Sequence, residues 1–155
     1  MTNGELQNVI SGWMEGLIFQ SEGKQYLTIT VPKENIRELM LKLKNDENTV
    51  FDFLFSLTAV DYFPANFGVI YHLESTKLRH MVAVICYTAD RENDISIDSI
   101  SDIFPTANFH EREAYDLMGI IFNGHPDLRR LFMTEDWVGH PLRKDYTDET
   151  NLIIR

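Results

Sequence analysis

Two apolar runs, Phe67-Gly68-Val69-Ile70-Tyr71-His72-Leu73-Glu74 and His80-Met81-Val82-Ala83-Val84-Ile85-Cys86-Tyr87-Thr88, lie on either side of the polar link Ser75-Thr76-Lys77-Leu78-Arg79. Both runs are rich in β-branched and aromatic residues, which pack well on the pleated surface of a strand. The pattern predicts a β-hairpin. A third apolar strand, Val50–Val60, precedes it and is broken by Asp61-Tyr62-Phe63-Pro64-Ala65-Asn66, so we expect a three-stranded antiparallel meander.

The residues before the meander add two strands and two helices. Leu17–Gln20 and Gln25–Val31 are predicted strands separated by a polar turn, and Leu6–Met14 is a predicted short helix. A second helix is expected to begin at Pro32, because proline is favoured in the first helical turn. Its apolar positions recur at helical spacing, at Ile36, Leu39, Met40 and Leu43. This order predicts an α+β fold in which helices pack on one face of a mainly antiparallel sheet.

Two helices are expected after the meander. Ser99–Phe104 is a predicted short helix, and residues 106–118 form a longer one that ends at Gly119, a residue suited to a helix C-terminus. The charge changes along this part of the chain, because acidic residues dominate from Ile85 to Ile120 and basic residues slightly outnumber them from Asp127 to Lys144. Two interpretations stay open: a solvated acidic face with a mixed tail, or a bipolar surface that orients a protein partner.

No sustained hydrophobic period is present from Asn123 onward. We therefore expect an α+β domain over residues 1–122, followed by an extended C-terminal partner-binding segment over residues 123–155 that belongs to the same structural unit. The tail Asp148–Arg155 is expected to be disordered when the protein is alone.

The composition suits a single domain, since the chain has 155 residues of which 44% are apolar. The formal net charge of −10 disfavours binding to nucleic acid or to an anionic membrane surface. The single cysteine, Cys86, lies in an apolar run and is expected to be a small buried hydrophobic residue. No signal peptide and no membrane-spanning stretch is recognisable, so a cytosolic chain is expected.

Two near-copies of one phrase lie in the last third of the chain: Gly124-His125-Pro126-Asp127-Leu128-Arg129-Arg130 and Gly139-His140-Pro141-Leu142-Arg143-Lys144-Asp145. Proline fixes φ and pushes the preceding histidine toward an extended conformation. Both phrases are therefore predicted to be stiff loops that hold basic side chains in set directions. A purely structural turn needs no paired basic tips, so these loops are the first place to look for function.

The phrase His110-Glu111-Arg112-Glu113-Ala114-Tyr115-Asp116 offers several possible chemistries. A zinc-protease motif would need a second histidine where Ala114 stands, so that motif fails. Arg112 and Asp116 are four residues apart and can pair along one helix face. Docking to a partner is the preferred interpretation, and a solvated charged face is the alternative. His125 or His140 could also serve as an acid–base group of a free-standing enzyme, although no nucleophile or phosphate-binding motif accompanies them.

Three ordered motifs resemble one family. The run from Glu111 to Ile120, followed by the two Gly-His-Pro phrases through Tyr146, closely resembles the signature of the thirty-kilodalton subunit of respiratory complex I, which in bacteria is the C subunit of NADH-quinone oxidoreductase. The upstream pieces Leu57-Thr58-Ala59-Val60-Asp61-Tyr62 and Phe104-Pro105-Thr106-Ala107-Asn108-Phe109 also fit, so the resemblance extends from about Val50 to Tyr146.

The resemblance implies a non-catalytic subunit in the peripheral arm of a proton-translocating NADH-quinone or ferredoxin-quinone oxidoreductase. Such a subunit binds no cofactor or metal, and it lies on the cytoplasmic side of the bacterial inner membrane, which it contacts only through the complex. Its partners would be the large hydrogenase-like subunit of the quinone site and neighbouring iron–sulfur subunits. By analogy, the residues expected at the partner interface are Glu111, Arg112, Glu113, Asp116, His125, Asp127, Arg129, Arg130, His140, Arg143, Lys144 and Asp145.

The end of the chain departs from many bacterial members, which continue well beyond the second Gly-His-Pro phrase. The stretch Met133-Thr134-Glu135-Asp136-Trp137-Val138, with Asp145-Tyr146 after the basic pair, is more similar to the short forms of ferredoxin-linked relatives. The electron donor is therefore left open. The alternative to a subunit of a quinone-reducing complex is the equivalent subunit of a membrane-bound, energy-converting nickel–iron hydrogenase.

Overall fold

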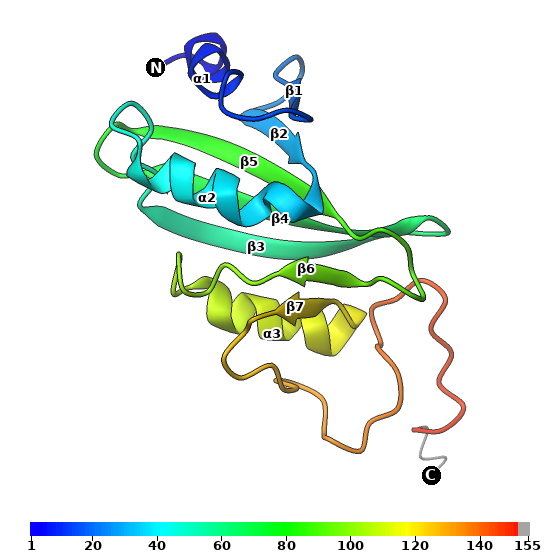
Figure 1. Cartoon of the computed structure of the whole chain (residues 1–155). Coiled ribbons are helices and arrows are strands. Elements are labelled where there is room, and N and C mark those ends of the chain that lie inside the picture. The colour runs from blue at the N-terminus through cyan, green and yellow to red at the C-terminus, as the bar shows by residue number, and fades with distance from the viewer. Residues whose placement is uncertain (152–155) are drawn as a thin grey trace.

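The structure, a computed structural model, describes residues 1–151. Its centre is a five-stranded sheet in the order β1-β2-β5-β4-β3 (Figure 1). The strands are β1 (Ile18–Gln20), β2 (Leu27–Val31), β3 (Phe53–Tyr62), β4 (Asn66–Ser75) and β5 (His80–Tyr87). Three of the four neighbouring pairs are antiparallel, and only β2 and β5 run parallel. The predicted α+β class with a mainly antiparallel sheet is confirmed.

The predicted meander is formed by β3, β4 and β5, with Tyr71 of β4 opposite Leu57 on one side and Val84 on the other. Side chains alternate between the two faces of the sheet. Tyr71 and Val84 are fully buried, whereas Ile70 and His72 on the opposite face are partly exposed. The buried face of the sheet and the apolar residues of the helix that follows β2, Ile36, Leu39, Met40 and Leu43, belong to one hydrophobic core. This is expected for a sheet with one covered and one open face.

The N-terminal helices differ from the prediction in their bounds. The first, α1 (Asn3–Ile10), begins three residues earlier than expected because Thr2 and Glu5 form a reciprocal capping box, and it ends four residues earlier than expected. After β2 the chain forms one 3₁₀ turn, η1 (Lys33–Asn35), and then α2 (Ile36–Asn45). Figure 1 shows α2 lying across the sheet. The four predicted core positions of α2 are all fully buried.

The predicted helix over Ser99–Phe104 is wrong. This stretch forms turns between the short strand β6 (Ser96–Asp98) and α3 (Ala107–Met118), and β7 (Ile121–Asn123) then returns to pair in parallel with β6. The turn is stabilised from outside its own backbone, because the side chain of Glu111 accepts hydrogen bonds from Ser99 and Ile100. The longer predicted helix is confirmed as α3, and Gly119 ends it in the left-handed conformation at φ 78°.

The remaining described part of the chain, residues 124–151, is named here the C-terminal segment, and it contains no helix or strand. It passes along the side of α3 and returns toward the end of the main sheet (Figure 1). Of the tail that was expected to be disordered, residues 152–155 lie outside the described residues. Within residues 1–151, no helix combines the length and the apolar character that crossing a bilayer requires.

Candidate functional site

Asp116, in the last turn of α3, holds the C-terminal segment against the helix. Its side chain is fully buried. Oδ2 accepts hydrogen bonds from the backbone N–H groups of Leu131, Phe132 and Met133, at 3.0, 2.6 and 2.9 Å. Burial by itself raises the pKa of this carboxyl, but the three N–H groups and the Arg130 guanidinium outweigh burial and hold the pKa below its ordinary value. The carboxylate therefore stays charged and fixes three consecutive residues of the segment.

Two arginines complete this attachment. Arg130 donates from Nη1 to Asp116 Oδ1 at 3.0 Å and from Nη2 to the carbonyl of Gly139 at 2.9 Å, so it connects the two Gly-His-Pro phrases. Arg112 donates from Nε and Nη2 to the carbonyls of Arg129 and Arg130, both at 3.2 Å. The pair expected along the helix face between Arg112 and Asp116 is replaced by contacts that each residue makes with the segment.

The second Gly-His-Pro phrase covers the C-terminal end of α3. His140 donates from Nδ1 to the carbonyl of Asp116 at 2.9 Å, and Arg143 donates from Nε to the carbonyl of Met118 at 2.7 Å. The last carbonyls of a helix lack partners within the helix and carry partial negative charge, so donors and cations are stabilising there. Burial lowers the pKa of His140. A Cβ on Gly119 would lie only 2.4 Å from Arg143 Nη2 and 2.7 Å from the His140 ring, so a larger residue here would displace both side chains from the end of α3.

A second attachment lies at the end of β3. Arg91 binds the buried carboxylate of Asp61 with both terminal nitrogens and also donates to Asp145 at 2.9 Å. Asp61 additionally accepts a hydrogen bond from the backbone N–H of Lys144 at 2.8 Å. The Arg91 guanidinium stacks 4.4 Å from the ring centre of Phe67, within the range of a cation–π contact. Nothing in the sequence pattern singled out Arg91, because a lone arginine in a polar loop carries no motif.

Glu111 forms a third buried contact. Its side chain is fully buried, with Oε2 accepting from Ser99 Oγ at 2.6 Å and Oε1 accepting from the N–H of Ile100 at 2.8 Å. Burial raises the pKa of this carboxyl to about 7. His125 lies beside it, with Nε2 3.9 Å from Glu111 Oε2, but that nitrogen donates to the carbonyl of Asn108 at 3.0 Å. His125 therefore positions the first Gly-His-Pro phrase on the start of α3.

The predicted interface residues thus fall into two groups. Seven are buried or half-buried and bonded within the chain, where they shape the C-terminal segment: Glu111, Arg112, Asp116, His125, Arg130, His140 and Arg143. Five are exposed: Glu113, Asp127, Arg129, Lys144 and Asp145. The motifs are therefore largely explained by folding of the segment itself.

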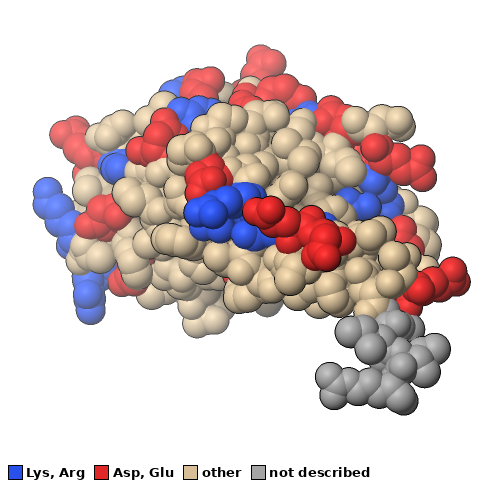
Figure 2. Space-filling model, turned by 90° about the horizontal axis from the view of Figure 1, so that it is seen from below, with Lys and Arg blue, Asp and Glu red and all other residues tan. Residues whose placement is uncertain are grey.

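Large apolar side chains are exposed on α3 and the C-terminal segment, and sequence reasoning did not pick them out. They are Phe109, Phe132, Val138 and Leu142, with exposed fractions of 62%, 59%, 56% and 56%. Figure 2 shows the molecule from the α3 side as a surface with broad uncharged areas around one group of basic side chains bordered by acidic ones. Exposed apolar side chains with a charged border are typical of protein–protein interfaces. We therefore define the candidate docking surface as these four apolar residues together with the five exposed charged residues.

The residues that could carry metal or thiol chemistry are separated in the structure. Within the part of the chain that the structure describes, no three His, Cys, Asp or Glu side chains converge closely enough to hold a metal ion. Cys86 lies in the core, where burial raises the pKa of its thiol to about 12. A thiol of that kind stays protonated near neutral pH and is a poor nucleophile.

Comparisons with known proteins agree with the motifs. Residues 29–151 match the family described as the 30 Kd subunit of the respiratory-chain NADH dehydrogenase. The NADH-quinone oxidoreductase C subunit of Citrifermentans bemidjiense is 45% identical over 128 residues, which cover 81% of this chain and 77% of that protein. The NADH-quinone oxidoreductase C/D subunit of Phocaeicola vulgatus is 49% identical over 123 residues, 79% of this chain, which thus spans only 23% of that relative's length.

Two solved structures share the fold. A trypsin-resistant fragment (1-134) of Nqo5 superposes with a TM-score of 0.69 at 30% identity, covering 81% of this chain and 98% of the fragment. A chain of the membrane-bound sulfane sulfur reductase, an archaeal respiratory membrane complex, superposes with a TM-score of 0.80 at 22% identity, covering 94% of this chain and 86% of that one. The second likeness concerns the fold alone. Together with the matched motifs, these comparisons show that the chain belongs to the family of the 30 Kd subunit of the respiratory-chain NADH dehydrogenase.

Proposed function

We propose that this chain is a non-catalytic subunit in the peripheral arm of a proton-translocating NADH-quinone or ferredoxin-quinone oxidoreductase, where it docks onto the large quinone-site subunit. The proposal is supported by relatives that are named as the C subunit of NADH-quinone oxidoreductase. Relatives named as its C/D subunit, in which the matching part is only 23–24% of the whole chain, also support it. A subunit that shares one polypeptide with another in some organisms is expected to contact that other subunit where the two are separate chains.

The observation that carries the proposal is the preformed C-terminal segment. Asp116 and Arg130 hold the segment from inside, and four large apolar side chains remain exposed on it and on α3. A segment that is already ordered loses less conformational entropy on binding, which favours a tight and specific complex. We assign residues 1–122 to the body and residues 123–155 to the docking part of one structural unit.

The exposed charged residues give this surface its polar rim. Arg129 has 67% of its side chain exposed, and its ion pair with Asp127 is solvent-screened and energetically weak. Arg129 can therefore exchange Asp127 for a carboxylate of another subunit at little cost in free energy. The rim is therefore proposed to set orientation and the rate of association, while the apolar residues supply most of the affinity. In this proposal the chain itself carries no cofactor, contacts no nucleic acid, and reaches the cytoplasmic face of the membrane only through the complex.

The test is a tagged pull-down from gently solubilised native membranes, with quantitative mass spectrometry of the associated subunits. The wild-type chain is expected to recover a large hydrogenase-like subunit and iron–sulfur subunits, and the donor module recovered with them would identify NADH or ferredoxin. Phe132→Asp, on the candidate docking surface, is expected to lose them. Ile18→Asp is the matched control, because Ile18 is 60% exposed on β1, away from that surface.

Three results would count against the proposal. Recovery of the wild-type chain alone would refute membership in such a complex. Recovery beside a large subunit with intact nickel-binding cysteines would favour the hydrogenase alternative. Equal loss of partners in Phe132→Asp and Ile18→Asp would move the interface away from the C-terminal segment.

A further inference from the structure

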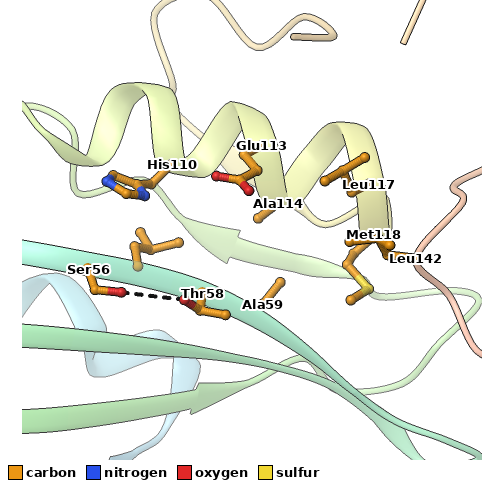
Figure 3. A pocket seen from close by; sticks show the side chains of 10 residues that line it. Ser56, Thr58, Ala59, His110, Glu113, Ala114, Leu117, Met118 and Leu142 are labelled. Carbon is orange, nitrogen blue, oxygen red and sulfur yellow. Dashed lines mark hydrogen bonds between the residues drawn. The ribbon is translucent and has the colours of Figure 1, made fainter. Parts of the chain in front are cut away.

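A groove lies between the outer edge of the main sheet and α3. β3 is the last strand in the sheet order, so one of its edges has no strand neighbour. The groove has a volume of about 210 Å³ and is lined by residues 56–59 of β3, by one face of α3 and by Leu142 of the C-terminal segment. Figure 3 shows the side chains of His110 and Glu113 extending from the helix toward Ser56 and Thr58 on the strand.

The two ends of the groove differ in chemistry. One end is apolar and is formed by Ala59, Leu117, Met118 and Leu142. At the other end are the hydroxyls of Ser56 and Thr58, whose oxygens are 3.4 Å apart, together with the His110 imidazole and the Glu113 carboxylate (Figure 3). A site of this kind matches a long side chain that has an aliphatic stem and a cationic head.

Glu113 is available to such a head. Among residues 1–151 its carboxylate forms neither an ion pair within 4 Å nor a side-chain hydrogen bond, unlike Glu111 and Asp116 on the same helix. The protein as a whole carries a formal net charge of −10, which at long range favours the approach of a cationic group over an anionic one.

The groove walls are held in place from inside the chain. The backbone N–H of Leu142 donates to the carbonyl of Leu117 at 3.0 Å, and Arg143 donates to the carbonyl of Met118 at 2.7 Å. Both contacts fix the position of Leu142 against the end of α3. A ligand therefore meets a preformed groove and does not have to order the segment when it binds.

We propose that this groove receives a single lysine or arginine side chain of the partner subunit. The aliphatic stem lies against Leu117, Met118 and Leu142, and the cationic head bonds the Glu113 carboxylate. The proposal rests on the proposed function, because it assigns one anchor contact of that complex.

Accessibility of the groove in the assembled complex provides the first test. Thr58→Cys introduces an exposed thiol at the groove, while the native Cys86 is buried and does not compete. The variant chain is labelled with a maleimide alone and in the purified complex. In a separate, unlabelled sample, a thiol-attached photo-cross-linker that reacts with any neighbouring residue identifies the adjoining stretch of the partner. We expect labelling to fall at least about tenfold in the complex, with a cross-link at or beside a lysine or arginine of the partner.

The charge of Glu113 provides the second test. Glu113→Gln keeps the shape and removes the charge, and it is expected to lower the partner retained in a pull-down about tenfold, as loss of one charge-assisted hydrogen bond implies. Glu47→Gln, on an exposed residue after α2, is the matched control and should have no effect. Replacement of the cross-linked partner residue by glutamate should reproduce the Glu113→Gln loss.

The outcomes separate the two proposals. If the wild-type chain recovers the oxidoreductase subunits but the thiol of the Thr58→Cys variant labels equally in the complex and alone, the groove proposal is overturned and the proposed function stands. A cross-link to a second copy of this chain, or to a partner stretch without lysine or arginine, overturns it as well. If the wild-type chain recovers no such subunits, both proposals fail.

Discussion

Removal of the Asp116 carboxylate should release the C-terminal segment from the body of the protein. The fully buried Oδ atoms accept hydrogen bonds from three backbone N–H groups and from Arg130, all between 2.6 and 3.0 Å. Asp116→Ala leaves these four donors without their acceptor. Breaking a buried charged network costs about 3–5 kcal/mol, and for a domain of this size that corresponds to a fall in melting temperature of about 10 °C.

The stabilising contribution of the Asp116 carboxylate should also depend on pH. The pKa of Asp116 is lower in the folded protein than its ordinary value, so its stabilising contribution is fully present above the pKa of an unfolded aspartate, about 4. The contribution is lost as pH falls through the lower pKa of the folded state. The difference in unfolding free energy between wild type and Asp116→Asn should therefore shrink as the pH is lowered below about 4.

Urea unfolding of the two variants measures these effects, and Asp127→Ala serves as control. Among residues 1–151, Asp127 forms an ion pair only with Arg129, and more than half of both side chains is exposed, so its loss should change stability by less than about 1 kcal/mol. If Asp116→Ala also changes stability by less than about 1 kcal/mol, and the amides of Leu131 and Met133 keep their exchange protection, then Asp116 does not hold the segment and the reasoning is refuted.

Three further predictions concern neighbouring contacts. Glu111→Gln should remove one pH-dependent contribution to stability. Burial raises the folded-state pKa of Glu111 from 4.5 to about 7, so the contribution of this carboxyl to the unfolding free energy should fall by up to about 3 kcal/mol between pH 4.5 and 7. The difference in unfolding free energy between wild type and variant should change by that amount in urea titrations at several pH values. Arg143→Ala should lower the unfolding free energy by about 1–2 kcal/mol because it removes the hydrogen bond to Met118 and the stacking on the Phe67 ring. Arg129→Ala, at an exposed position, should change the unfolding free energy by no more than about 0.5 kcal/mol in thermal melts. Equal losses of stability in the two variants would contradict the assignment. Gly119→Ala should cost at least about 1 kcal/mol because of its positive φ and the clash with Arg143 and His140, and an unchanged melting temperature would show that the segment can move away.

The sheet was predictable because its signal is local. Strands β4 and β5 carry continuous apolar and aromatic runs across a short polar link, and α3 ends at a glycine as its pattern required. Strands β6 and β7 have three residues each, which is too short for a period to be read. In Ser99–Phe104 the apolar residues are spaced as in a helix, yet the stretch forms turns because Glu111, eleven and twelve residues later, binds its polar groups.

The site was only partly predictable for a related reason. The motifs pointed to the correct region, but charge alone did not show whether a carboxylate faces a partner or the protein's own backbone. Asp116 is held by N–H groups fifteen to seventeen residues further along the chain, and Arg91 reaches Asp145 across 54 residues. No local pattern encodes such contacts. The exposed apolar residues were missed because a single phenylalanine such as Phe109 or Phe132 carries no sequence signal of exposure.

Hydrogen exchange of the full chain, alone and in the purified complex, tests the central claim most directly. In the proposed complex, the chain itself orders its C-terminal segment and the partner then covers the exposed surface. The amides of Leu131, Phe132, Met133 and Leu142 should already be protected in the isolated chain, and protection around the exposed Val138 should increase only in the complex. Exchange of residues 131–133 at the rate of an unfolded chain in the isolated protein would contradict the central claim, because order in the segment would then come from the partner.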